Sequence, residues 1–341
     1  MRLQAATYQA AFDYNNAVRT YLELYEATKT AKKLGIKAPD PLPGEQPRTL
    51  EQIGLDSLFN AALASELNRD FKKAIDLYTQ YQRVEPERRK KDRALWSIGG
   101  IYRQSGDVNS MSETFARWRA TYGKDAGNED DFVQSFYDES QLRKRKGQTP
   151  QARKAGEETI AAWKQQGALK NSRGARLAGE WQLAFAEDHF TATWDPLEIK
   201  KAARTLDEAK TQNKTLTDAK TRAEDRYLQL DQYGVLEYTM AAKVRYADIQ
   251  VGFAQKVGNA PIPTPIANKD ELVAAYEAQR DKNVERYTNE AKGQWMEVVD
   301  AAKKAGVSNR WSKLAQENLG REFPGEFTVL RQELVQGTEA P

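Results

Sequence analysis

Apolar residues recur three or four positions apart along most of the chain, and polar residues fill the positions between them. This spacing places the apolar side chains on one face of an α-helix. Residues that favour helices dominate the sequence, whereas the runs of Val, Ile and Thr that are typical of strands are missing. The pattern therefore predicts an all-α protein.

The helical pattern repeats along the first half of the chain. A polar turn at residues 68–70 is followed by a small residue, Ala74, and then by large apolar residues. Ala62 takes the small position in the preceding helix, and Gly99 takes it in the next unit. Met111 follows Ala74 by 37 residues, close to the period of roughly 34 residues of tetratricopeptide repeats (TPRs). The sequence thus resembles a TPR array, a right-handed solenoid of antiparallel helix pairs.

A weaker third copy spans residues 132–166, with Gly147 in its turn and Ala152 at the helix contact. We expect Thr149 and Pro150 to begin its second helix, Thr149 as the N-cap and Pro150 in the first turn.

The beginning of the chain fits the same template. Residues 13–24 match the second helix of a pair, and Ala5 and Tyr8 match its partner helix. Met1 would then lie inside that partner helix, and half a repeat leaves an apolar face uncovered. We therefore expect this chain to be a piece of a longer protein.

The repeat pattern divides the chain into regions. TPR-like repeats cover residues 1–167 and are interrupted at residues 32–51 by a proline-rich insert, which predicts an exposed loop of roughly 15 residues. Residues 168–335 continue as helix without the strict repeat, and residues 336–341 form a polar tail. We expect longer, irregular helices in this C-terminal region.

Helix start and stop signals place these longer helices. Asp195, followed by proline, predicts a helix start, and residues 222–257 predict one long helix with a possible break near Gly234. Residues 258–268 then form a proline connector that we expect to be extended, polyproline-like and packed through its isoleucines.

Two further helices are expected after this connector. Asn268 or Asp270 would cap a helix that is antiparallel to the preceding one and reaches about residue 305. Ser308 would cap the last helix, with Trp311 on its inner face.

Charge and composition exclude several classes of protein. The 52 basic and 49 acidic residues give a net charge of +3, which provides no strong field for nucleic acid or an anionic membrane. The absence of cysteine excludes disulfides and thiolate metal sites, and fits either a reducing cytoplasm or a periplasm. No apolar run reaches the roughly 18 residues of a membrane-spanning helix.

No pattern of catalytic residues is recognisable. His189 is the only histidine and has no identifiable companions for a metal site or a catalytic triad. The pair Gly99 and Gly100 lies in a repeat helix rather than in a phosphate-binding loop, and the carboxylates are scattered. The sequence thus predicts a non-enzymatic protein with no catalytic residue, no cofactor and no metal.

The C-terminal part carries a more specific resemblance. The resemblance lies in five segments: residues 238–242, the APIP connector at 260–263, residues 270–276, the AGVSNRW segment at 305–311 and the FPGEF segment at 323–327. These segments resemble the adventurous-gliding-motility TPR lipoproteins of myxobacteria and related deltaproteobacteria.

This resemblance implies a scaffold in a multiprotein complex of the cell envelope, in the periplasm or associated with the outer membrane. Members of that family are anchored through an N-terminal lipidated cysteine. Because this chain has no cysteine, its membrane attachment would require an anchor upstream of the given sequence.

In TPR arrays, the first helix of each pair lines a concave surface that binds partner segments. Counting the repeat positions that face this surface gives candidate partner-binding residues from three units: Asp56, Phe59, Arg93, Trp96, Arg103, Gln104, Tyr137, Gln141, Lys144 and Arg145. The cations and aromatics among them suit an acidic peptide segment. They do not reproduce the carboxylate clamp of chaperone-binding TPR domains.

Other interpretations remain open. The cations could simply be solvated, with Trp96 packed against a neighbouring unit. The protein could also be a cytoplasmic TPR adaptor or an RNA-associated helical-repeat protein, since basic runs at residues 88–91 and 143–146 lie near aromatic residues. The balanced net charge argues against nucleic acid as the partner.

Overall fold

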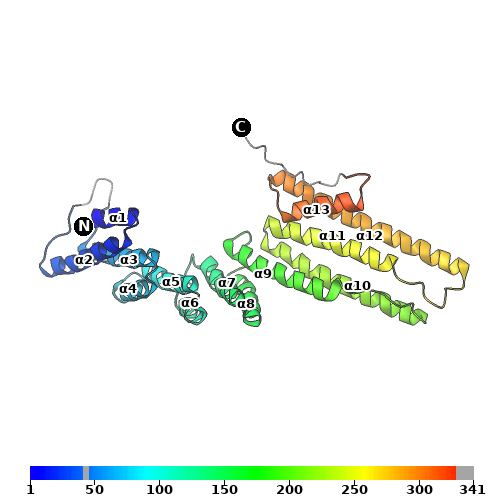
Figure 1. Cartoon of the computed structure of the whole chain (residues 1–341), viewed down its shortest axis with the longest axis horizontal. Coiled ribbons are helices and arrows are strands. Elements are labelled where there is room, and N and C mark those ends of the chain that lie inside the picture. The colour runs from blue at the N-terminus through cyan, green and yellow to red at the C-terminus, as the bar shows by residue number, and fades with distance from the viewer. Residues whose placement is uncertain (41–45, 328–341) are drawn as a thin grey trace, which may run out of the picture. The chain divides into compact units, whose positions relative to one another are not determined.

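The computed structural model describes residues 1–40 and 46–327, and these ranges form 13 α-helices without a strand (Figure 1). The prediction of an all-α fold is confirmed. The chain divides into two compact units, Met1–Ala162 and Trp163–Pro341. The division lies inside a helix, slightly before the boundary after residue 167 that the repeat pattern placed.

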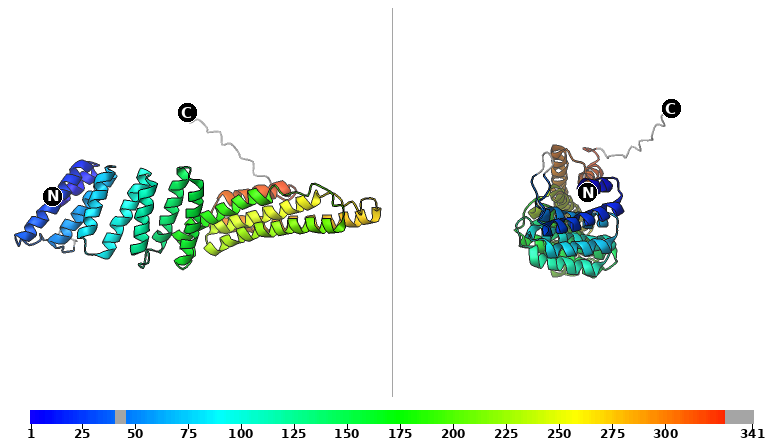
Figure 2. Two further views of the ribbon diagram at one scale, coloured as in Figure 1. Left: turned by 90° about the horizontal axis from the view of Figure 1, so that it is seen from below. Right: turned by 90° about the vertical axis from the view of Figure 1, so that its left-hand side faces the viewer.

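The N-terminal unit consists of antiparallel helix pairs that lie side by side (Figure 2). Its helices are α1 (Arg2–Ala10), α2 (Tyr14–Lys33), α3 (Leu50–Leu67), α4 (Phe71–Val84), α5 (Arg88–Ser105), α6 (Val108–Tyr122), α7 (Glu129–Arg145) and α8 (Thr149–Gln165). Met1 occupies the N-cap position of α1 without a capping hydrogen bond from its side chain.

The turns inside these helix pairs share one conformation. Two residues before each second helix, the backbone is left-handed, at Phe12, Arg69, Gly106 and Gly147. An aspartate follows in three of the four turns, and its side chain accepts a hydrogen bond from the backbone N–H three residues on: Asp13, Asp70 and Asp107. Because this bond satisfies one of the unpaired N–H groups of the first helical turn, it defines where the helix begins. In the fourth turn, Thr149 is already the first residue of α8. The N-cap position therefore lies one residue earlier than the sequence predicted.

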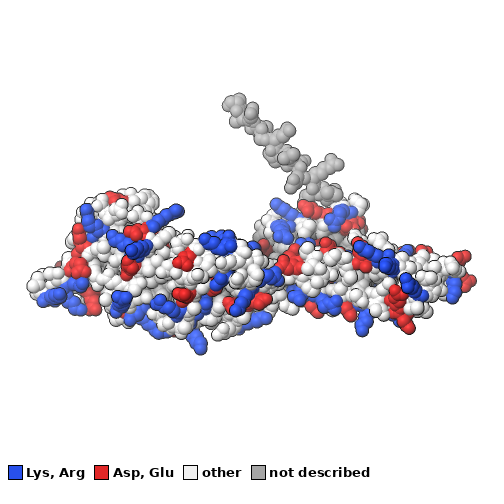
Figure 3. Space-filling model, turned by 60° about the horizontal axis from the view of Figure 1, so that its bottom comes forward, with Lys and Arg blue, Asp and Glu red and all other residues white. Residues whose placement is uncertain are grey.

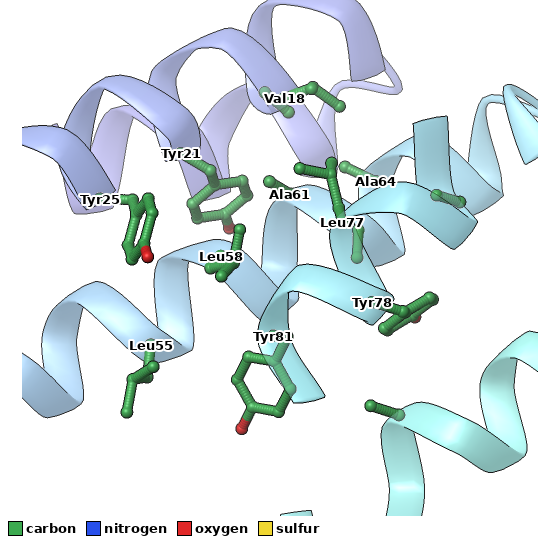
Figure 4. Packing of buried hydrophobic residues seen from close by; sticks show 14 of the residues in the cluster. Val18, Tyr21, Tyr25, Leu55, Leu58, Ala61, Ala64, Leu77, Tyr78 and Tyr81 are labelled. Carbon is green, nitrogen blue, oxygen red and sulfur yellow. The ribbon is translucent and has the colours of Figure 1, made fainter. Parts of the chain in front are cut away.

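A continuous apolar core joins the first helices (Figure 4). Five large side chains from three helices are buried in the space between these helices: Tyr21 and Tyr25 of α2, Leu58 of α3, and Tyr78 and Tyr81 of α4. Such aromatic side chains each bury a large apolar area. Their burial is therefore the main favourable term that holds these helices together.

Small residues lie where the helices of a pair approach most closely. Ala62 and Ala74 have no exposed surface, and Ala152 is almost completely buried. At Gly99 of α5, an added Cβ atom would lie less than 3.0 Å from the ring of Phe115 in α6. The sequence prediction that Ala62, Ala74 and Gly99 mark close helix contacts is confirmed.

The proline-rich insert separates α2 from α3. Helix α3 begins with a capping box in which Thr49 and Gln52 exchange hydrogen bonds between side chain and backbone. The described residues between Leu34 and Thr49 are not helical, as the prolines predicted. Residues 41–45, including Pro41 and Pro43, lie outside the described residues, as does the predicted tail at 336–341.

The C-terminal unit is a bundle of long helices. It contains α9 (Arg173–His189), a π-helical turn (Phe190–Trp194), α10 (Leu206–Leu228), a 3-10 turn (Gln229–Tyr233), α11 (Leu236–Gly258), α12 (Asp270–Ala305) and α13 (Arg310–Glu322). Helices α11 and α12 pack along each other as a hairpin, with α10 against α11 and α13 against α12 (Figures 1 and 2).

The predicted helix start at Asp195 is wrong. Helix α9 continues through the π-helical turn to the buried Trp194, and Pro196 follows this end. Proline is common both in the first turn of a helix and just beyond a helix end, so the residue alone does not distinguish the two. Helix α10 begins after Thr205, whose hydroxyl accepts a hydrogen bond from the N–H of Glu208.

The long helix predicted over residues 222–257 is two helices. The chain breaks at Gly234, which adopts the left-handed conformation, so the break considered near this residue is present. The expected cap at Asn268 or Asp270 is absent, because Lys269 precedes α12 without a side-chain bond. The cap expected at Ser308 is instead Asn309, which forms a capping box with Ser312.

The proline connector between α11 and α12 is only partly extended. Pro263 is buried, and the next residue, Thr264, donates its backbone N–H to the carbonyl of Ala203. Residues 264–268 then form consecutive turns. Contacts with the segment before α10 thus replace part of the polyproline-like geometry that the sequence predicted, while Ile262 and Ile266 are half-buried as expected.

A polar network ties the C-terminal bundle together. Arg245 of α11 binds both carboxylate oxygens of Glu187 in α9 at 2.7 Å and Asp248 at 3.0 Å. Tyr227 donates to Glu187 at 3.0 Å, and Asn318 of α13 donates to Asp248 at 2.8 Å. Because every charged group in this network has an opposite charge or a hydrogen-bond partner, its burial is tolerated.

Replacing Gly99 by Ala should lower the free energy of unfolding by about 1–3 kcal/mol, because the new methyl group overpacks the contact with Phe115. Urea denaturation measures this change. Gly100→Ala is the matched control, since a Cβ atom there meets nothing within 4 Å. The control should be neutral or stabilising by roughly 0.5–1 kcal/mol. Equal stabilities of the two variants would contradict the described contact between α5 and α6.

Two buried tyrosines of the C-terminal unit should respond differently to loss of the hydroxyl group. The hydroxyl of Tyr233 is buried without a hydrogen-bond partner among the described residues, whereas that of Tyr238 donates to the carbonyl of Arg176 at 2.5 Å. Tyr233→Phe should therefore leave the melting temperature unchanged or raise it. Tyr238→Phe should cost about 1 kcal/mol, the usual net value of one hydrogen bond. The reverse order in thermal melts would show that the two hydroxyls are assigned wrongly.

Candidate functional site

Two hollows in the N-terminal unit share Phe59 and Arg93 as walls, and we call them together the α3–α5 groove. The first hollow has a volume of about 180 Å³ and is lined by Arg48, Asp56, Phe59, Asn60, Tyr81, Lys90 and Arg93. The second has a volume of about 560 Å³ and is lined mainly by Phe59, Leu63, Glu66 and Tyr78 from α3 and α4, by Arg89, Asp92, Arg93, Trp96 and Ser97 from α5, and by Gly127, Asn128 and Asp131 at the start of α7.

Helical spacing brings these side chains to one surface. The lining residues of α3 lie three or four positions apart between Asp56 and Glu66, and those of α5 recur in the same way from Lys90 to Trp96. Residues with this spacing share one face of a helix. Gly99 lies on the same side of α5 as Asp92 and Trp96 and packs against Phe115 of α6, so this side of α5 borders both α6 and the groove.

Aromatic rings form the floor of the groove. The ring of Phe59 meets those of Tyr78 and Tyr81 edge to face, with centroids 5.3 and 5.2 Å apart. Trp96 is half-buried and packs on Phe115 and Trp118, with centroids 4.9 and 4.7 Å apart. These contacts hold Phe59 and Trp96 in place while leaving part of each at the groove.

Most charges at the first hollow are already paired. Arg48 lies 3.0 Å from Asp56, and Lys90 lies 3.2 Å from Glu87. Burial alone would lower the pKa of Lys90, but the pairing with Glu87 and nearby carboxylates raise it, so Lys90 stays protonated. The exposed Arg93 differs, since no hydrogen bond or ion pair joins its guanidinium to another described residue. Its donors are available to a ligand.

In the second hollow, two carboxylates accept hydrogen bonds from neutral side chains. Glu66 accepts hydrogen bonds from the Tyr78 hydroxyl at 3.1 Å and from the Gln104 amide at 3.2 Å. Buried Asp92 accepts from the indole N–H of Trp118 and, at 2.8 Å, from the Asn128 amide. Burial raises the pKa of Glu66 because these bonds do not offset its loss of hydration.

The structure brings together four of the ten candidate residues: Asp56, Phe59, Arg93 and Trp96 line the groove. Arg103 is instead paired with Asp138 at 2.5 Å, and Gln104 is bonded to Glu66 beside the groove. Tyr137, Gln141, Lys144 and Arg145 line neither hollow.

Arg103, Lys144 and Arg145 therefore do not join Arg93 and Trp96 at the groove. Helix α7 presents its first turn to the groove, at Asn128 and Asp131. Lys144 lies 16 residues beyond Asn128, which corresponds to about 24 Å along a helix. The ring of Trp96 packs on α6, the other helix of its own pair, rather than on a neighbouring unit.

Sequence reasoning missed Arg48, Asn60, Tyr81 and Lys90, which also line the first hollow. Lys90 and Asn60 could have been found from helical spacing, since Lys90 lies three residues before Arg93 and Asn60 four residues after Asp56. Arg48 lies in the loop before α3, where no repeat template applies. Tyr81 belongs to α4, the second helix of its pair, whereas the repeat count covers only first helices.

Two further hollows, of about 390 and 470 Å³, border residues 198–200 in the segment before α10. No group of three or more His, Asp or Glu side chains is arranged to hold a metal ion within residues 1–40 and 46–327. His189 lies 3.1 Å from the Thr193 hydroxyl, and burial together with Arg226 and Arg222 lowers its pKa. Acidic and basic side chains are interspersed over the face shown in Figure 3. None of the helices in the described ranges is long and apolar enough to cross a membrane.

Comparison with protein-family models and with curated proteins gives no match to this chain. The function is therefore argued from the residues and geometry of the α3–α5 groove and from the sequence resemblance.

Proposed function

We propose that the protein is a non-enzymatic scaffold of the TPR type that binds a segment of a partner protein in the α3–α5 groove. The observation that carries this proposal is that Arg93, whose guanidinium has no ion pair or hydrogen bond among the described residues, lines the groove together with the aromatic rings. An exposed arginine next to partly covered aromatic rings is typical of residues that dominate protein–protein binding.

The repeated construction of the helix pairs supports the TPR assignment. Each of the four pairs turns through a left-handed residue two positions before its second helix, and the contact positions carry alanine or glycine. In stacked helix pairs of this kind, the first helices of successive pairs form an extended binding surface. The groove lies between two such first helices, α3 and α5.

The chemistry of the groove suits an extended peptide with a carboxylate. A guanidinium can donate two parallel hydrogen bonds to a carboxylate, which gives both strength and orientation. An apolar or aromatic side chain of the partner would lie against Phe59 and Trp96 in the larger hollow. The contact between carboxylate and guanidinium should weaken with added salt, whereas the apolar contact with Phe59 and Trp96 should not.

The cellular setting rests on the sequence resemblance of the C-terminal region to TPR lipoproteins of gliding motility. We propose a place in a complex of the cell envelope, on the periplasmic side or associated with the outer membrane. A cytoplasmic adaptor with the same groove is the alternative. Locating a tagged form of the natural full-length protein by fractionation would distinguish them.

Replacing Arg93 by Glu should abolish capture of the partner. The substitution removes the guanidinium that donates hydrogen bonds to the partner's carboxylate, and the new carboxylate repels it. The measurement compares proteins retained from source-cell extract by the full chain and by the variant, with helicity and melting temperature checked for each. Arg117→Glu on α6 is the matched control, since Arg117 is exposed and lines neither hollow. Retention of the same proteins by Arg93→Glu would show that the binding surface is elsewhere.

A further inference from the structure

The two halves of the α3–α5 groove differ in charge. In the first hollow, Arg48, Lys90 and Arg93 face the single carboxylate of Asp56. The second hollow carries three carboxylates, Glu66, Asp92 and Asp131, against Arg89 and the shared Arg93. The groove therefore has a basic end and an acidic end along the direction of α3.

Pairing within the protein leaves Arg93 as the available cation of the basic end, because Arg48 is paired with Asp56 and Lys90 with Glu87. At the basic end, Arg93 has no ion pair among the described residues. At the acidic end, Glu66 and Asp92 receive hydrogen bonds from a phenol, an indole and amides, but no described cation lies within ion-pair distance of either carboxylate. Neutral donors stabilise a carboxylate without forming an ion pair with it, so a cation brought into this hollow is favoured.

The length of the groove sets an upper limit on the spacing of a ligand's charges. Its lining residues on α3 extend from Asp56 to Glu66, and ten residues of helix correspond to about 15 Å. An extended peptide advances about 3.3 Å per residue, so roughly four to five residues cover this distance.

We propose that the groove binds a dipolar peptide segment, whose carboxylate lies at Arg93 and whose cationic side chain lies at Glu66, both of which line the second hollow. An apolar or aromatic residue between these charges packs on Phe59 and Trp96. The proposal rests on the function proposed above and narrows the acidic partner expected from sequence, because a uniformly acidic segment would meet Glu66 and Asp92 in the second hollow.

The test uses a random library of linear peptides selected on the full chain. Affinities of the enriched peptides are then measured for the parent protein and for Arg93→Ala and Glu66→Gln. Glutamine at position 66 keeps an acceptor for the Tyr78 hydroxyl and removes the charge. Glu113→Gln on α6 is the matched control, because Glu113 is exposed and lines neither hollow.

The dipolar ligand predicts that enriched peptides carry an acidic and a basic residue within about five positions of each other, since the whole groove is no longer than that. Arg93→Ala and Glu66→Gln should each weaken them about tenfold, since each removes one partner of a charge-assisted contact, and Glu113→Gln should not. Replacing the peptide's Lys or Arg by Gln should remove the effect of Glu66→Gln, as a double-mutant cycle requires of a direct pair.

Two other results would overturn the inference in different ways. If peptides sensitive to Arg93→Ala contain no cation, or are unaffected by Glu66→Gln, the dipolar ligand is wrong while the groove remains a binding site. If no enriched peptide is sensitive to Arg93→Ala, the proposed function fails together with the inference. Melting temperatures equal to that of the parent protein are required of every variant.

Discussion

The close approach of paired helices at small residues determines what the rest of the N-terminal unit can do. At Gly99, the ring of Phe115 occupies the space in which a side chain would lie, so α5 packs closely against α6 there. Asp92 and Trp96 lie on the same side of α5 as Gly99 and also contact α6, through Trp118 and Phe115. This packing holds Trp96 at the edge of the groove, beside Arg93.

Arg93 in the groove and Arg245 in the core of the C-terminal unit differ in whether the protein's own carboxylates already bind them. Arg245 is held by Glu187 and Asp248 and lies over the rings of Phe190 and Trp311 at 5.4 and 5.5 Å. It joins helices, since its Nε and both terminal nitrogens each donate a hydrogen bond within that network. Arg93 has neither a carboxylate partner nor a hydrogen bond among the described residues. A protein that retains an uncommitted guanidinium beside aromatic rings has a surface suited to a ligand.

The sequence was sufficient for those parts of the fold that depend on local chemistry. Gly99, Ala62 and Ala74 were identified because helix contact tolerates only small side chains, and the break at Gly234 because glycine adopts the left-handed conformation easily. The helix start at Asp195 was predicted wrongly because Pro196 has the same local meaning after a helix as inside its first turn. Only the burial of Trp194 in the bundle decides between the two.

The candidate site was predictable where it lies on one helix face and unpredictable where it depends on long-range packing. The repeat register correctly placed Phe59, Arg93 and Trp96 on a common surface. It could not show that Arg103 would be paired with Asp138, a residue 35 positions away. The register also could not show which end of α7 borders the groove. The first turn does so, because of the way successive helix pairs are rotated against each other.

Site-specific photo-crosslinking in the cells that make the protein tests the central claim most directly. A benzophenone amino acid at Asn60 places the reactive group in the first hollow, and the same residue at Glu113 places it on exposed α6. The account predicts a partner crosslinked from position 60 and not from position 113, and loss of that product when Arg93→Glu is added. A product that forms from position 113 alone, or that persists with Arg93→Glu, would contradict binding in the α3–α5 groove.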